Sequence, residues 1–155
     1  MRKVLERPNV LGHEPHLAGV PDYAILQLRQ LMRCRRFEAR EQVLIRSRDP
    51  PTFFAVLSGI VTVKLQPASS VVEEGMKLDP AGVVTMTLTA GKVFGSDWML
   101  GVEKPGANRL VSVVAGSRNT TLLLMERSTF DAWLGKDPIV WKILNETISR
   151  MYTAT

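Results

Sequence analysis

Residues 88–115, LTAGKVFGSDWMLGVEKPGANRLVSVVA, are the stretch that decides the fold of this chain. A short apolar approach runs into Gly91, and the apolar pair Val93-Phe94 leads on to Gly95. Residues 98–100 then have the pattern of a single helical turn. Ser96 or Asp97 has the side chain to cap the first amides of that turn. The stretch therefore predicts a strand, a tight turn and a short helix in close succession.

Arg109 opens the next alternating apolar run, which extends to Ala115. Glycine lets a backbone approach a ligand closely, and the free N–H groups at a helix start attract anions. An arginine that returns to the same place supplies a forked, permanently charged partner for a phosphate. The pattern predicts a phosphate cradle, and a plain turn between two strands is the alternative that it leaves open.

Length and composition place the chain among ordinary globular domains. It has 155 residues, of which 45% are hydrophobic and 23% charged, so one domain with one buried core is expected. The sequence contains neither an apolar run long enough to span a bilayer nor the apolar segment of a secretory signal. A single cysteine, Cys34, excludes an internal disulfide. We expect a cytoplasmic protein without a membrane segment.

The net charge is +5, and arginines crowd residues 29–48. Such a cluster is able to bind nucleic acid or acidic lipid. However, aromatic residues do not alternate with these arginines, and no helix-turn-helix or RNA-binding motif follows. We interpret it as a solvated basic face or a surface for another protein. Its members are Arg29, Arg33, Arg35, Arg36, Arg40, Arg46 and Arg48.

Periodicity divides the rest of the chain into an arm and one domain. Residues 1–20, with both histidines (His13 and His16), are expected to form a flexible arm and a poor metal site. Residues 21–155 form the domain. A helix is predicted over 21–36, with Cys34 near its end. A second helix is predicted to be capped by Ser128, and a third to start after Asp137-Pro138. Strands are predicted over 42–45, 52–57, 60–65, 83–88, 110–115 and 120–125, with a long hairpin tip over 66–82 and a tight turn over 116–119.

Many short strands between terminal helices indicate an α+β fold. The expected architecture is an antiparallel β-barrel of the jelly-roll type, with an N-terminal helix and two C-terminal helices. The last helix carries an apolar stripe at helical spacing, which we interpret mainly as core. The stripe consists of Val140, Ile143, Leu144, Ile148 and Met151.

Three stretches, in this order, resemble the cyclic-nucleotide-binding domain family. Residues 49–59, DPPTFFAVLSG, are similar to the family pattern G-D-x-x-x-x-F-Y-x-I-x-x-G. Residues 89–95, TAGKVFG, resemble its x-P-G-x-x-F-G approach to the phosphate-binding cassette, and residues 108–115, NRLVSVVA, resemble its P-R-A-A-T-V-x-A exit. The resemblance covers approximately residues 22–152.

The resemblance implies a set of ligand-binding residues. Arg109 would pair with the cyclic phosphate, Gly95 and Ser96 would present backbone amides to it, and Ser112 matches a small hydroxyl residue near the purine. Where Ser96 stands, the family has a glutamate that accepts a hydrogen bond from the ribose, and Asp97 lies one residue later. The full set is Phe94, Gly95, Ser96, Asp97, Trp98, Arg109, Leu110, Ser112, Met151 and Tyr152, the last two over the base.

The resemblance implies a regulatory module that binds cAMP or cGMP and relays occupancy through its C-terminal helix. No cofactor or metal is expected, and no catalytic triad, metal-ligand cluster or Walker loop points to an enzyme. The alternative is a scaffold that binds no nucleotide and contacts another protein or a neighbouring domain. A DNA-binding regulator would need a helix-turn-helix after the last helix, so no nucleic-acid partner is expected for these residues.

Overall fold

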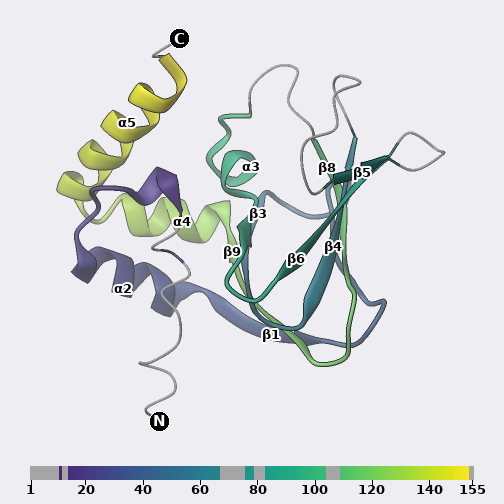
Figure 1. Ribbon diagram of the computed structural model, residues 1–155. Helices are drawn as coiled ribbons and strands as arrows, with labels where there is room; N and C mark the ends of the chain where they lie inside the picture. Colours follow the sequence, from purple (N-terminus) through teal and green to yellow (C-terminus); the bar gives the residue numbers. More distant parts are fainter. Residues whose placement is uncertain (1–10, 12–13, 67–75, 79–82, 104–108, 154–155) are drawn as a thin grey trace.

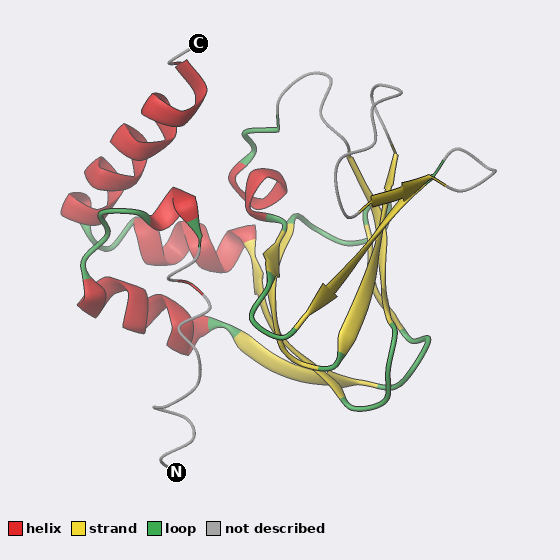
Figure 2. Ribbon diagram, viewed as in Figure 1, coloured by secondary structure: helices red, strands yellow, loops and turns green. Residues whose placement is uncertain are grey.

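The computed structural model describes residues 11, 14–66, 76–78, 83–103 and 109–153. Its helices lie on one side of the strands, and α3 lies where the two groups meet (Figures 1 and 2). The helices are η2 (Pro15–Leu17), α2 (Asp22–Leu31), α3 (Ser96–Leu100), α4 (Arg127–Leu134) and α5 (Pro138–Thr153). The strands are β1 (Arg33–Phe37), β2 (Gln42–Ile45), β3 (Thr52–Ser58), β4 (Ile60–Gln66), β5 (Met76–Leu78), β6 (Val84–Thr89), β7 (Val93–Phe94), β8 (Arg109–Ala115) and β9 (Thr120–Glu126).

The strands form two antiparallel sheets that face each other. One has the order β1-β9-β3-β7, and the other has the order β2-β8-β4-β6-β5. The α+β class with antiparallel strands is confirmed, but the closed barrel is a wrong prediction. Among the described strands, no hydrogen-bonded ladder joins an edge of one sheet to an edge of the other. The strand pairing therefore produces an open roll of two sheets.

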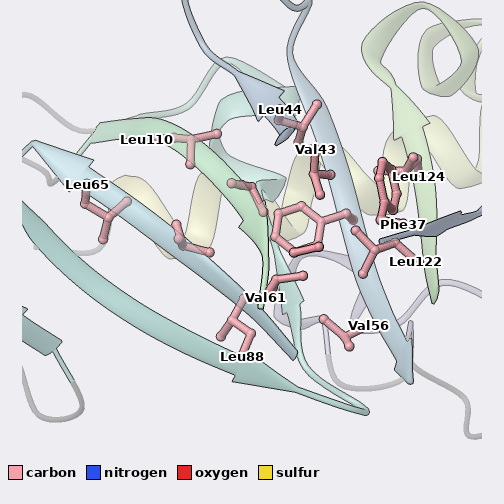
Figure 3. Packing of buried hydrophobic residues seen from close by; sticks show 14 of the residues in the cluster. Phe37, Val43, Leu44, Val56, Val61, Leu65, Leu88, Leu110, Leu122 and Leu124 are labelled. Atoms are coloured by element: carbon pink, nitrogen blue, oxygen red, sulfur yellow. The ribbon is translucent and has the colours of Figure 1, made fainter. Parts of the chain in front are cut away.

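The space between the sheets is filled with apolar side chains (Figure 3). Strand β4 shows the reason, because its buried and exposed residues alternate and place Val61, Val63 and Leu65 inside. Burying one such side chain contributes about 1.5–3 kcal/mol. The buried members of this interior cluster are Phe37, Val43, Leu44, Phe54, Val56, Val61, Val63, Leu65, Val84, Leu88, Trp98, Leu110, Val113, Ala115, Leu122 and Leu124.

The first helix is shorter than predicted. Helix α2 ends at Leu31, and Arg33–Phe37 pair with β9 as strand β1. Phe37 is buried while the four residues before it, Cys34 included, are exposed. The basic run was therefore wrongly assigned to a helix, because pairing with β9 and the burial of Phe37 outweigh its local helix propensity.

The two C-terminal helices follow the prediction with one change at their starts. The side chain of Asp137 accepts hydrogen bonds from the amides of Ile139 and Val140, at 3.1 and 3.3 Å, and so caps α5. Helix α4 instead begins at Arg127 with Glu126 at its N-cap position, so the predicted cap at Ser128 is wrong. Tyr23 of α2 donates a 2.8 Å hydrogen bond to Asp137 and ties the helices together.

The segment before α2 is packed against the domain, unlike the flexible arm predicted for residues 1–20. Leu11, His16 and Leu17 are buried in the core that the helices share with the first sheet. Thr147 of α5 donates a 3.2 Å hydrogen bond to the carbonyl of Ala18. Within its described part, this segment therefore belongs to the domain. No described helix is both long enough and apolar enough to cross a membrane.

Candidate functional site

Gly95 sets the geometry of the predicted cradle. It precedes α3 in a left-handed conformation with φ of 99°. A Cβ atom built on it would lie 2.4 Å from the carbonyl oxygen of Thr52 in β3. The short helix is present as predicted, but neither Ser96 nor Asp97 caps it with a side-chain hydrogen bond. The glycine therefore lets the turn approach the backbone of β3, which a sequence pattern alone does not reveal.

Three of the predicted binding residues contribute to the interior of the roll. Trp98 and Leu110 are buried, with 7% and 3% of their surface exposed. Phe94 is half-buried, and its ring lies 5.9 Å from that of Phe54 in β3. These residues pack between the sheets, and the buried indole of Trp98 anchors α3 to the core.

Arg109 and Ser112 lie on β8 with different exposure. Arg109, the first residue of the strand, pairs in register with Gln66 and has an exposed side chain. In the part of the chain that the structure describes, no carboxylate forms an ion pair with Arg109. Ser112 is buried and pairs in register with Ile45 of β2. Strand β8 therefore presents an exposed cation at its start and a hydroxyl farther inside.

Asp97 is paired with a histidine from the N-terminal segment. Nε2 of His16 lies 3.1 Å from Oδ1 of Asp97, and Nδ1 of His16 forms a short contact with Oε1 of Glu14. Only 4% of His16 is exposed. Burial alone would lower its pKa, but hydrogen bonds to Asp97 and Glu14 outweigh that effect and raise the pKa from 6.5 to about 9. A buried imidazolium therefore joins the segment before α2 to the start of α3.

Comparisons with solved structures identify the architecture. One match is the N-terminal domain of a transcriptional regulator from Streptomyces coelicolor A3(2), with 16% identity and a TM-score of 0.67, covering 94% of this chain and 93% of that chain. Another is the Thermus thermophilus catabolite activator protein, with 19% identity and a TM-score of 0.58, covering 91% of this chain and 59% of that chain. A third is a cyclic nucleotide-binding-like protein from Brucella abortus, with 13% identity and a TM-score of 0.58, covering 84% and 98% of the two chains.

The chain has the catabolite-activator fold. The resemblance predicted from the sequence is thus confirmed at the level of fold. No protein-family model and no curated protein matches the sequence. The chain spans 59% of the catabolite activator, so that comparison does not concern the whole of that protein.

In this chain the catabolite-activator fold carries an arginine that sequence reasoning missed. Arg46, just after β2, donates two hydrogen bonds to Glu103, from Nη1 to Oε2 at 2.9 Å and from Nη2 to Oε1 at 2.5 Å. Its guanidinium carbon lies 5.3 Å from the centre of the Trp98 ring. The hydrogen bonds to Glu103 raise the pKa of Arg46 above its ordinary value. The sequence grouped Arg46 with the basic cluster and gave no signal for this pairing.

The apolar stripe of α5, the closing helix, lies mostly in the core in this chain. Val140 and Leu144 of α5 are buried, and Ile143 packs against the same cluster. Met151 lies near the end of the helix and is 36% exposed. The side chain of Tyr152 lies outside the described part of the structure, so its expected place over a base stays a prediction. Among the described residues, no group of His, Cys, Asp and Glu is arranged to hold a metal ion.

The raised pKa of His16 predicts a pH-dependent stability. Because the folded pKa of about 9 exceeds the ordinary value of 6.5, the protonated form stabilises the fold. The contribution is complete below pH 6.5 and is lost as the pH rises through 9. Since one pKa unit corresponds to about 1.4 kcal/mol, the free energy of unfolding should fall by up to about 3 kcal/mol over this pH range. Urea unfolding at a series of pH values from neutral to alkaline measures it.

The variant His16→Gln is the control for this prediction. Glutamine is a hydrogen-bonding residue that does not titrate in this range. Its stability curve should lack the alkaline step and keep only the effects of other titrating groups. If the curves of parent and variant ran parallel through pH 9, the buried imidazolium would not be the group responsible.

Proposed function

We propose that this chain is a regulatory ligand-binding module that binds a cyclic nucleotide, cAMP or cGMP, at the end of the roll where α3 and β8 begin. The observation that carries the proposal is Arg109, an exposed arginine at the first position of β8. It occupies the position at which the predicted family resemblance requires a phosphate partner. Support also comes from the fold, since one solved structure of the same fold is a cyclic nucleotide-binding-like protein.

In this proposal, the described residues have separate roles. Arg109 pairs with the cyclic phosphate through its guanidinium fork. The backbone at Gly95 and Ser96 contributes amides, and Ser112 offers a hydroxyl from the buried part of β8. The relay of occupancy uses α5, whose Thr147 is hydrogen-bonded to the segment that carries His16. Ligand binding shifts such an element only through contacts that differ between its two states.

We predict that Arg109→Ala weakens cyclic-nucleotide binding by about one to two decades and leaves the fold intact. A hydrogen bond to a charged group contributes about 1.5–3 kcal/mol, and each 1.4 kcal/mol corresponds to a tenfold change in affinity. The side chain is exposed, so its removal leaves no buried cavity. Calorimetric titration with cAMP and with cGMP measures the loss.

Arg118→Ala is a matched control for this substitution. Arg118 is also exposed, but it lies in the turn that follows the other end of β8. The control removes the same charge and should leave the affinity unchanged. Equal affinities for the parent chain and Arg109→Ala, in samples with the same melting temperature, would exclude the phosphate role of Arg109.

A protein-interaction scaffold is the second candidate function, and two observations favour it. One oxygen of the Asp97 carboxylate already accepts a hydrogen bond from His16, which reduces its capacity to accept one from a ribose. The indole of Trp98 occupies part of the interior at the end of the roll. Titration of the parent chain with cAMP, cGMP and adenosine separates the two functions. Binding of a cyclic nucleotide but not of adenosine supports the module, and no saturable binding of any of them supports the scaffold.

A further inference from the structure

The ion pair between Arg46 and Glu103 has the geometry of an occupied anion site. We infer that Arg46 and Trp98 form a second anion-binding seat at this end of the roll, that Glu103 fills it in the absence of ligand, and that the phosphate group of a ligand takes its place. The inference does not require that a cyclic nucleotide binds at Arg109. It assigns a separate group of residues and a chemical class of ligand, a phosphate.

The hydrogen bonds define the shape of the seat. Two nitrogens of Arg46 contact two oxygens of Glu103, at 2.9 and 2.5 Å, in the fork-to-fork arrangement that arginine makes equally with carboxylates and phosphates. The guanidinium also lies over the ring of Trp98, which restricts its orientation. The fork is therefore oriented before any ligand arrives, so less entropy is lost when an anion binds.

Partial burial makes an anionic partner favourable at this place. The side chains of Arg46 and Glu103 are 27% and 18% exposed, so both are partly withdrawn from water. A withdrawn cation is costly without a partner, whereas one anion replacing another preserves the two hydrogen bonds. Phosphate offers the same pair of acceptor oxygens as the carboxylate. Exchange is therefore less costly than opening the pair to solvent.

The position of the seat connects it to β8 and α3. The amide of Arg46 donates a 3.0 Å hydrogen bond to the carbonyl of Val111, two residues after Arg109 on the same strand. Trp98 lies in α3, two residues after Ser96. A phosphate-bearing ligand at this end of the roll would therefore meet two cations, Arg109 exposed and Arg46 covered by Glu103.

Removing the carboxylate tests the inference with inorganic phosphate as the probe. Glu103→Gln keeps the length of the side chain but removes the carboxylate with which Arg46 pairs among the described residues. We expect the dissociation constant for phosphate, measured by calorimetry at constant ionic strength with chloride as the counter-anion, to fall at least tenfold relative to the parent chain. The double variant Glu103→Gln/Arg46→Gln should lose this gain.

Several results would overturn the inference. Unchanged phosphate affinity in Glu103→Gln would mean that the pair only fastens the residues after α3 to β2. An equal gain in the double variant would assign the phosphate to another cation. If Glu103→Gln fails to fold, Glu103→Asp retains the charge but shortens the side chain, and it should bind phosphate more tightly than the parent. No gain in that variant would also reject the seat.

The outcome is separable from the test of the proposed function. Arg109→Ala is assayed with cyclic nucleotide and Glu103→Gln with phosphate alone. In the Glu103→Gln background, adding Arg109→Ala should leave at least half of the phosphate affinity, because Arg46 holds the anion. Complete loss in that combination would place the phosphate at Arg109 and contradict the second seat.

Discussion

Trp98→Ala is expected to lower the free energy of unfolding by about 3–5 kcal/mol, the usual cost of removing a large buried aromatic side chain. Trp98 belongs to α3 but packs between the two sheets, with only 7% of its surface exposed. Its loss leaves a cavity lined by apolar side chains and also removes the ring that supports Arg46. Urea unfolding followed by circular dichroism measures the change.

Trp141→Ala is the matched control, because the same side chain is removed from an exposed position on α5. Trp141 is 54% exposed, so its removal should change stability by no more than about 0.5 kcal/mol. A dry apolar cavity binds small apolar molecules, so free indole should raise the melting temperature of Trp98→Ala and not of Trp141→Ala. Equal losses in the two variants would show that the indole of Trp98 is not a core element.

Six strands were predictable because their signal is local, namely β2, β3, β4, β6, β8 and β9. In β4 the alternation of apolar and polar residues over 60–65 agrees with the burial pattern of Ile60–Gln66. Strand β1 carries no such alternation, because four exposed residues, three of them arginines, precede its single buried residue, Phe37. These residues form a strand because they pair with β9, which is far away in the sequence. A prediction from local pattern therefore continues the preceding helix through them.

The turn and the short helix at the candidate site were predictable, but their contacts were not. The glycine pattern placed a turn and a short helix at residues 95–100, and both are present. The partner of Asp97 is a histidine in a segment expected to be a flexible arm, and Arg46 meets Glu103 across a separation of 57 residues. Neither pairing has a periodicity or spacing that a single sequence displays. Both arise only when the chain brings distant segments to the same end of the roll.

Gly95 belongs to the local glycine pattern and also contacts a distant segment, β3. The variant Gly95→Ala should destabilise the protein by about 3 kcal/mol or more. The left-handed φ of 99° costs an L-residue about 1–2 kcal/mol. The new Cβ would also lie 2.4 Å from the carbonyl oxygen of Thr52. Because that oxygen belongs to the backbone of β3, relief requires α3 to move away from the sheet, and overpacking of this kind adds about 1–3 kcal/mol. Thermal and urea unfolding measure the sum.

Gly91→Ala separates the two contributions. Gly91 has a similar φ of 91°, but a Cβ there would meet no atom within 4 Å. This variant should therefore show only the conformational cost of about 1–2 kcal/mol. The difference between the two variants measures the close approach of Gly95 to β3. Equal losses would mean that the contact with Thr52 relaxes freely, and the glycine at position 95 would then be explained by backbone conformation alone.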